Sequence, residues 1–185
     1  MTNAAEVVRP LLRVRQVREF TDEPLSTEVL DALADAARWS GSSTNSQPWR
    51  FVIVRSADTL RAIAAAGLPQ TRSLETATAA IAIVLPEDPG SGISHAFDEG
   101  RAAERMLVAA SLLGVGAGIA WILPKVRPTV ASLLALPDGR FVRTMVALGH
   151  PTDAARRPKS AHGEARLPRE ETVFSETWGS AAADS

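Results

Sequence analysis

Four short apolar runs, separated by segments with a helical pattern, constrain the fold of this chain more than any other feature. Each run is rich in β-branched, aromatic or alanine residues and is bounded by turn-forming residues, which is typical of buried strands. The four runs are residues 49–54, 79–85, 117–122 and 141–148. Residues 171–175 can form a fifth strand. Strands that alternate with helices predict one layered domain of the α+β (α/β layered) class, with helices packed on a central sheet.

Between the runs, apolar residues recur at every third or fourth position, as on the buried face of an amphipathic helix. The predicted helices are residues 26–40, 58–66, 96–113 and 128–136. Ser26 is placed to cap the first helix, and Gly67 to end the second. The longest helix, 96–113, is rich in alanine, and the segment 86–94 before it is a turn-rich connection.

Composition excludes several kinds of chemistry. The 185 residues include no cysteine, which rules out disulfides, thiolate nucleophiles and iron–sulfur clusters, and no tyrosine to act as an acid or base. The histidines, His95, His150 and His162, lack the spacing of a helical metal site, so we expect no metal. A net charge of −1 gives no general attraction to nucleic acid or to a membrane surface. The N-terminus shows no signal-peptide pattern, and we expect a cytoplasmic protein without a membrane span.

The character of the chain changes after Gly149. The remaining residues contain several prolines, many charges and no long apolar period, so they cannot build a core of their own. We therefore expect a single domain over residues 1–185, in which residues 151–185 form an extended C-terminal arm.

Two polar segments stand out as candidate binding sites. In the first, Arg13, Arg15 and Arg18 lie close together near the end of a helix. The fork of donors on arginine suits a phosphate group. The alternative is a solvated basic face that the neighbouring acidic residues balance.

The second segment is Asn45-Ser46-Gln47-Pro48-Trp49. Its asparagine and glutamine amides each carry donors and an acceptor, which suits a heterocycle with mixed N–H and C=O edges. The alternative is an ordinary turn that leads into the strand beginning at Trp49.

In this order and at this separation, the two segments resemble the nitroreductase family of FMN enzymes. The family's opening Arg-Arg-Ser-x-Arg-x-Phe motif is matched by Val14-Arg15-Gln16-Val17-Arg18-Glu19-Phe20, and its Asn-x-Gln-Pro-Trp motif by the segment 45–49. Further stretches resemble family motifs in the same order: Asp98-Glu99-Gly100, the glycine-rich 113–118, Leu148-Gly149-His150-Pro151, and Arg166-Leu167-Pro168. The resemblance covers residues 11–174, which is nearly the whole chain.

The resemblance implies a nitroreductase-like fold with a mainly antiparallel sheet of four to five strands. It also implies an intertwined homodimer that binds FMN at the subunit interface, with the C-terminal arm wrapping the partner subunit. The implied cofactor-binding residues come from the arginine motif, the amide loop, the third strand and the C-terminal motif. They are Arg13, Arg15, Gln16, Arg18, Ser43, Asn45, Gln47, Trp121, Ile122, Leu123 and Arg166.

The resemblance also implies a role for each group of contacts. The arginine motif would bind the FMN phosphate, and Arg18 would face the N1/C2 edge of the flavin, where a positive charge favours reduction. Asn45 and Gln47 would lie at the pyrimidine edge of the ring. A backbone N–H near Trp121 and Ile122 would meet flavin N5, although Trp121 is equally consistent with a core position.

The chain departs from the family pattern at two positions of the cofactor site. Val14 stands where arginine is usual, and Gln16 where serine is usual. Either Arg13 replaces the missing arginine from one position earlier, or the phosphate depends more on Arg15 and Arg166.

The implied activity is hydride transfer from NADH or NADPH, through flavin N5, to a nitroaromatic, a quinone or a related small electrophile. No side chain need act as a catalytic acid, base or nucleophile. Two alternatives remain: a flavin dehydrogenase or oxidase of the same fold in a biosynthetic pathway, and a non-catalytic FMN-binding dimer. None of the three needs a metal, a nucleic acid or a membrane.

Overall fold

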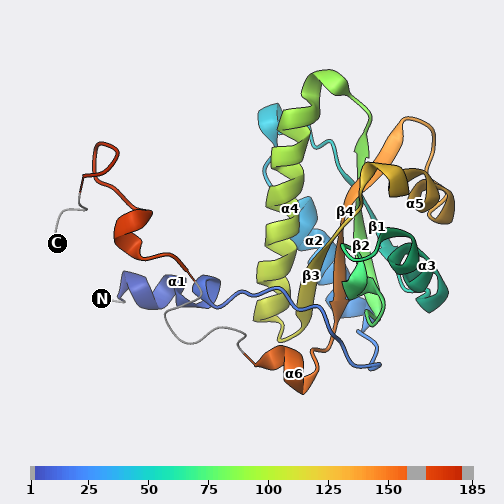
Figure 1. Cartoon of the computed structure of the whole chain (residues 1–185), viewed down its shortest axis with the longest axis horizontal. Helices are drawn as coiled ribbons and strands as arrows, with labels where there is room; N and C mark the ends of the chain where they lie inside the picture. Colours follow the sequence, from blue (N-terminus) through green and yellow to red (C-terminus); the bar gives the residue numbers. More distant parts are fainter. Residues whose placement is uncertain (1–2, 158–165, 181–185) are drawn as a thin grey trace.

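The computed structural model describes residues 3–157 and 166–180, and its body is a four-stranded sheet with helices on both faces (Figure 1). The helices are α1 (Ala4–Leu12), α2 (Thr27–Arg38), α3 (Ala57–Gly67), α4 (Gly92–Leu112), α5 (Arg127–Leu133) and α6 (Asp153–Arg156). The strands are β1 (Arg50–Val54), β2 (Ala79–Pro86), β3 (Gly116–Trp121) and β4 (Arg140–Gly149). Short 3₁₀ turns lie at Ser43–Asn45, Arg72–Leu74, Pro89–Ser91, Pro124–Val126 and Arg169–Glu171.

The sheet has the order β1-β2-β4-β3, and every neighbouring pair is antiparallel. The central strand β2 is buried on both faces because alternate residues enter two separate cores. Ile81 and Ile83 pack on the side of α2 and α4, whereas Ala82 and Val84 pack on the side of α3 and α5. The prediction of a layered α+β fold with helices on a mainly antiparallel sheet of four to five strands is thereby confirmed, with four strands in the sheet.

Local signals place α2 and α3 where the sequence predicts them. The Oγ of Ser26 accepts a hydrogen bond from the N–H of Val29 at 3.2 Å, and the Oγ of Ser56 caps α3 in the same way. Such caps satisfy N–H groups that the first helical turn leaves without a partner. The buried face of α2 then carries Leu30, Leu33 and Ala37 into the core.

Other boundaries differ from the prediction. Helix α4 begins at Gly92, earlier than the expected 96, because Pro89 starts a 3₁₀ turn that leads directly into the helix. Helix α5 ends at Leu133 instead of 136, and Ala135 has a φ of 48°, which breaks the helical path. Helix α6 was not predicted, and α1 was expected only as a helix that ends near Arg13. Neither has a buried residue, and Figure 1 shows α1 extending away from the sheet.

The expected fifth strand at 171–175 does not form within the single chain. Its first residue closes the turn Arg169–Glu171, and residues 172–175 pair with no strand in the described ranges. A short β-prone segment becomes a strand only when a sheet edge accepts it. That residues 172–175 add a strand to the sheet of a partner subunit stays a prediction. Among the described residues, no helix combines the length and the apolar composition that crossing a bilayer requires.

The chain between α1 and α2 passes closely over β3 and β4. The N–H of Val17 donates to the carbonyl of Ala117 at 2.8 Å, and the N–H of Thr21 donates to the carbonyl of His150 at 2.8 Å. A Cβ at Gly118 would overlap the carbonyl oxygen of Val17. The close approach therefore requires glycine at that position.

We predict that Gly118→Ala destabilises the fold by about 1–3 kcal/mol, because the added methyl group must displace backbone and not a flexible side chain. Urea unfolding followed by circular dichroism measures this free energy. Gly92→Ala is the matched control, since a Cβ at the exposed Gly92 meets no atom within 4 Å. Equal stability of the two variants would contradict the close approach of the segment to β3.

Candidate functional site

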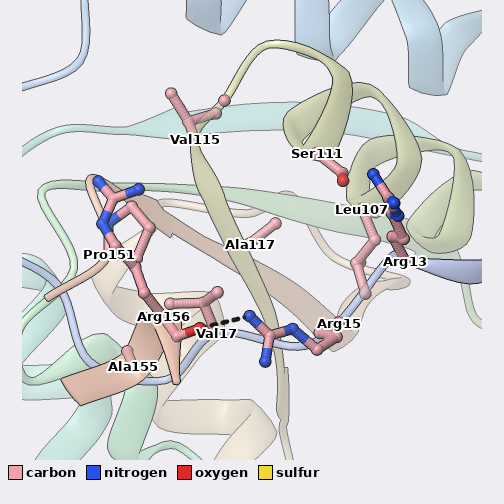
Figure 2. Close-up of a pocket in the computed structure, with 11 residues that line it drawn as sticks. Arg13, Arg15, Val17, Leu107, Ser111, Val115, Ala117, Pro151, Ala155 and Arg156 are labelled. Atoms are coloured by element: carbon pink, nitrogen blue, oxygen red, sulfur yellow. Dashed lines mark hydrogen bonds between the residues drawn. The ribbon is translucent and has the colours of Figure 1, made fainter. Parts of the chain in front are cut away.

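Arg13 and Arg15 line a cavity of about 180 Å³ between the N-terminal segment, the C-terminal half of α4 and α6 (Figure 2). Helix α1 ends at Leu12 and Arg13 is its C-cap, so the chain leaves the helix at this point. The Nη2 of Arg15 donates a hydrogen bond to the carbonyl oxygen of Arg156 at 2.7 Å. Two of the predicted arginines, Arg13 and Arg15, thus line the same cavity, and Arg156 of α6 is a third arginine in its lining.

Three guanidinium groups around one small cavity make a cationic site. Their charges repel one another, so an anion is the favourable occupant. Arginine forks suit the oxygens of a phosphate or carboxylate in particular. Arg13, Arg15 and Arg156 are all exposed, and the anion-binding interpretation of the arginine run stays a prediction.

Gln16 connects the arginine motif to β3 through hydrogen bonds. Its Oε1 accepts one hydrogen bond from the N–H of Ile119 at 3.3 Å and another from Nη2 of Arg18 at 3.2 Å. A second cavity, of about 210 Å³, is lined by this glutamine and arginine together with Glu19 and residues of α6. The glutamine that departs from the family pattern therefore holds Arg18 beside the middle of β3.

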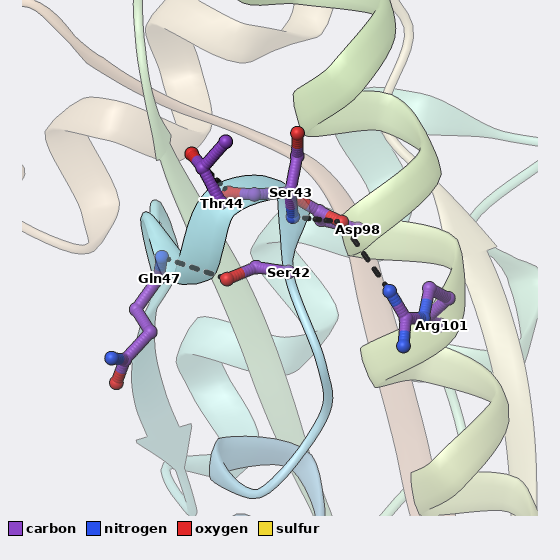
Figure 3. Close-up of polar contacts among 6 residues, drawn as sticks. All are labelled: Ser42, Ser43, Thr44, Gln47, Asp98 and Arg101. Carbon is purple, nitrogen blue, oxygen red and sulfur yellow. Dashed lines mark hydrogen bonds and ion pairs between the residues drawn. The ribbon is translucent and has the colours of Figure 1, made fainter.

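The amide loop, residues 42–47, has an unusual backbone. Thr44, Asn45 and Gln47 have φ values of 50°, 57° and 47°. These left-handed conformations are uncommon for residues other than glycine, and asparagine tolerates them best. The loop closes on itself where the Oγ of Ser42 accepts a hydrogen bond from the N–H of Gln47 at 2.9 Å (Figure 3).

The side chains of Asn45 and Gln47 are exposed at the tip of this loop. The Nε2 of Gln47 donates to Oδ1 of Asn45 at 3.2 Å, which leaves both amides with unused donors and acceptors. An amide pair that faces solvent in the single chain is available for a ligand. The structure thus places both predicted residues side by side.

Asp98 of α4 anchors the amide loop. Its carboxylate is almost fully buried, and its two oxygens accept hydrogen bonds from the N–H of Ser43 at 3.2 and 3.0 Å (Figure 3). The Nη1 of Arg101, one turn further on, lies 3.9 Å from Oδ1 of Asp98 and balances the charge of the carboxylate. Ser43 therefore holds the loop against α4 through its backbone N–H and not through its side chain.

The amide loop and the arginine cavity lie far apart in the single chain. The loop is anchored at Asp98, in the first half of α4, whereas the cavity is lined by Leu107 and Ser111 near its end. Asp98 and Ser111 are separated by about 20 Å along the helix axis, from the rise of an α-helix. One chain alone does not bring the two predicted halves of the site together.

The residues at the end of β3 differ in how their backbone N–H groups are used. The N–H of Ile122 donates to the carbonyl of Arg143 at 2.8 Å, and that of Trp121 makes a long bond of 3.4 Å to Gln70. No hydrogen bond of the Leu123 N–H is found within the ranges that the structure describes. The side chain of Trp121 is 44% exposed, which excludes the core position considered for it.

Arg166 is exposed at the start of the second described range and does not belong to the lining of the arginine cavity. Residues 158–165, which join it to α6, lie outside the described residues. Its predicted contact with a phosphate stays a prediction.

Sequence reasoning missed Arg156 and the anchoring role of Asp98. Arg156 had no local signal, because only the packing of α6 beside the N-terminal segment gives it a role. Asp98 had a weak signal. It precedes Ala102 and Met106 on the inward face of the alanine-rich helix, where a charged residue needs a partner.

Residues 13–150 match the model of the nitroreductase family. Since this match spans most of the chain, the protein belongs to the nitroreductase family and is an NAD(P)H oxidoreductase of that family.

The relatives agree with this assignment. An Archaeoglobus fulgidus protein, provisionally named NADH dehydrogenase/NAD(P)H nitroreductase, is 29% identical over 155 residues, covering 80% of this chain and 87% of its own. The FMN reductase [NAD(P)H] of Bacillus subtilis is 28% identical over 192 residues, covering 94% of this chain and 74% of its own. The FMN-dependent nitroreductase of Clostridium difficile R20291 is 20% identical and superposes with a TM-score of 0.76, covering 91% and 98% of the two chains. The last similarity shows the shared fold.

We predict that Asp98→Asn lowers the free energy of unfolding by about 1–3 kcal/mol, because a hydrogen bond to an ionised acceptor is replaced by a weaker one. Faster hydrogen exchange at the Ser43 amide should accompany the loss. Asp35→Asn is the control, since Asp35 forms an exposed pair with Arg38 on α2. If the two variants behave alike, Asp98 does not anchor the loop.

Proposed function

We propose that this chain uses FMN to pass hydride from NADH or NADPH to a nitroaromatic, a quinone or a related small electrophile. The observation that carries the proposal is the cavity lined by Arg13, Arg15 and Arg156, which lies beside the start of β3. The names of two relatives, an FMN reductase and an FMN-dependent nitroreductase, support the choice of cofactor.

The residues present fit FMN in their charge and in their positions along β3. The arginine cavity would hold the phosphate, because the positive charge of its three arginines would balance the negative charge of that group. Gln16 and Arg18 follow beside the middle of β3, and Trp121 stands at the end of the strand. Six residues of β3 span about 17–20 Å, which gives room for a phosphate at one end and a ring system at the other.

Arg18 would place a positive charge beside the ring, where electron density increases on reduction. The backbone contact to flavin N5 would come from Trp121, whose present bond is long, or from Leu123, whose N–H has no partner among the described residues. Ile122 is the weakest of the three candidates because its N–H already donates to Arg143. When bound, FMN would supply the redox chemistry, and the protein supplies position and charge.

The proposal includes a homodimer, because a second copy can complete the site. Two α4 helices packed antiparallel about a two-fold axis would bring the amide loop of one subunit towards the arginine cavity of the other. The outer face of α4 is apolar enough for such a contact, with Ile93, Phe97 and Leu112 exposed by 91%, 69% and 68%. In the same dimer, residues 151–185 would form the arm that wraps the partner.

Two functions of the same fold compete with this proposal: a pathway dehydrogenase or oxidase that needs no nicotinamide, and a non-catalytic FMN-binding dimer. We predict that the purified protein shows the absorbance of oxidised flavin, directly or after incubation with FMN. Anaerobic addition of NADH or NADPH should then bleach it. Bound flavin that neither nucleotide bleaches would favour one of the competing functions. No flavin binding at all would overturn the proposal.

We predict that Arg15→Gln weakens FMN binding by about 10- to 100-fold, the factor that corresponds to one charge-assisted hydrogen bond. Quenching of flavin fluorescence measures the Kd. The binding of riboflavin, which lacks the phosphate, should change little in the same variant. Arg61→Gln is the control, since Arg61 forms an exposed pair with Asp58 on α3. A parallel loss of FMN and riboflavin binding would place the phosphate elsewhere.

A further inference from the structure

A buried ion pair joins α4 to the sheet behind the end of β3. The Nε of Arg143, in β4, donates to Oε2 of Glu99, in α4, at 2.7 Å, and its Nη2 lies against the same oxygen. The two side chains are only 17% and 3% exposed. A buried pair of this kind adds little stability over apolar residues of similar size, so its presence calls for another role.

Arg143 occupies a bulge in β4. Ile83 of β2 faces Thr144 and Val84 faces Val142, which leaves Arg143 without a partner on β2. Bulges re-aim a side chain and often lie next to active sites. Here the bulge turns the guanidinium towards α4, where Glu99 receives it.

Arg143 also holds the end of β3 in two ways. Its carbonyl oxygen accepts the N–H of Ile122 at 2.8 Å. Its guanidinium carbon lies 5.9 Å from the centroid of the Trp121 ring, within the range of a cation–π contact. One residue therefore sets both the backbone and the exposed ring at the place proposed to meet the flavin.

The charges behind Trp121 are close to balance. The guanidinium carbon of a second arginine, Arg127, lies 4.6 Å from the centroid of the Phe141 ring. Burial, together with the charge of Arg143, lowers the pKa of Arg127 below its ordinary value. Glu99 and Glu87 oppose that shift. The Oε1 of Glu99 is buried and has no hydrogen-bond partner among the described residues, so this carboxylate is held by Arg143 alone.

We propose that Glu99 and Arg143 are positioning residues for the flavin ring. Together they orient Trp121 and the end of β3, and because their charges are opposite, the pair itself adds little net charge near the ring. This inference rests on the proposed function, since it needs a flavin at the end of β3. It assigns a role to two residues that lie outside the proposed cofactor contacts.

Replacing one residue of the pair with a neutral residue leaves the charge of the other residue unbalanced. Glu99→Gln leaves an unbalanced guanidinium, and a positive charge near the ring favours its reduced form, so the reduction potential of the bound flavin should rise. Arg143→Gln leaves an unbalanced carboxylate, and the potential should fall. The measurement is made at alkaline pH, because a buried carboxylate that loses its partner takes up a proton more easily. The double variant should return towards the wild-type potential.

The position of Trp121 gives a second readout that does not depend on turnover. In the flavin-loaded full-length protein, the indole N–H signal of Trp121 is identified in the NMR spectrum by its loss in Trp121→Phe. Both single variants and the double variant should shift this signal, because each removes part of the support behind the ring. Asp58→Asn, which alters an exposed pair on α3, should change neither the signal nor the potential.

Shifts of the potential in the same direction in both single variants would overturn the charge-balance role. An unmoved Trp121 signal would overturn the positioning role. If a single variant does not fold, the double variant still decides, since it should combine a near wild-type potential with a shifted Trp121 signal. Failure of the wild-type protein to bind FMN would refute the proposed function instead, and the Trp121 signal of the flavin-free protein would still test the positioning.

Discussion

The structure depends on the close passage of residues 16–21 over β3 and β4. Because Gly116, Gly118 and Gly149 carry no Cβ, the segment lies directly against the strands, and Phe20 fills the space over two of these glycines. Its backbone then bonds to Ala117 in β3 and to His150, the residue that follows β4. The same contact fixes where Arg15 and Arg18 leave the backbone. The fold and the proposed cofactor site therefore share one steric constraint, and a larger side chain under the segment would disturb both.

Much of the fold follows from local sequence patterns. Strand β2 and helix α2 were predicted closely because their own residues decide their burial: β2 is apolar at every position, and α2 has a cap and one apolar face. The fifth strand is not formed within the single chain, for the opposite reason. The pattern of residues 171–175 is compatible with a strand, but only a free sheet edge in the right place would make it one.

The candidate site was predictable in part. Arginines and amides at motif spacing identified the cavity and the loop, since those residue types suit a phosphate and a heterocycle by their own chemistry. Arg156, Asp98 and the pair Glu99–Arg143 acquire their roles only through packing between distant elements. The bulge at Arg143 arises from pairing between β2 and β4, and a strand pattern read along one segment contains no sign of it.

The distance between the amide loop and the arginine cavity has a genetic consequence under the proposed homodimer. Each of the two sites would take its arginines from one subunit and its loop from the other. A chain defective only in the cavity and a chain defective only in the loop would each form dimers without a complete site. Mixed dimers of the two would contain one complete site and one that carries both defects. Two inactive alleles would then complement each other in the same cell, a behaviour that a site contained within a single chain does not allow.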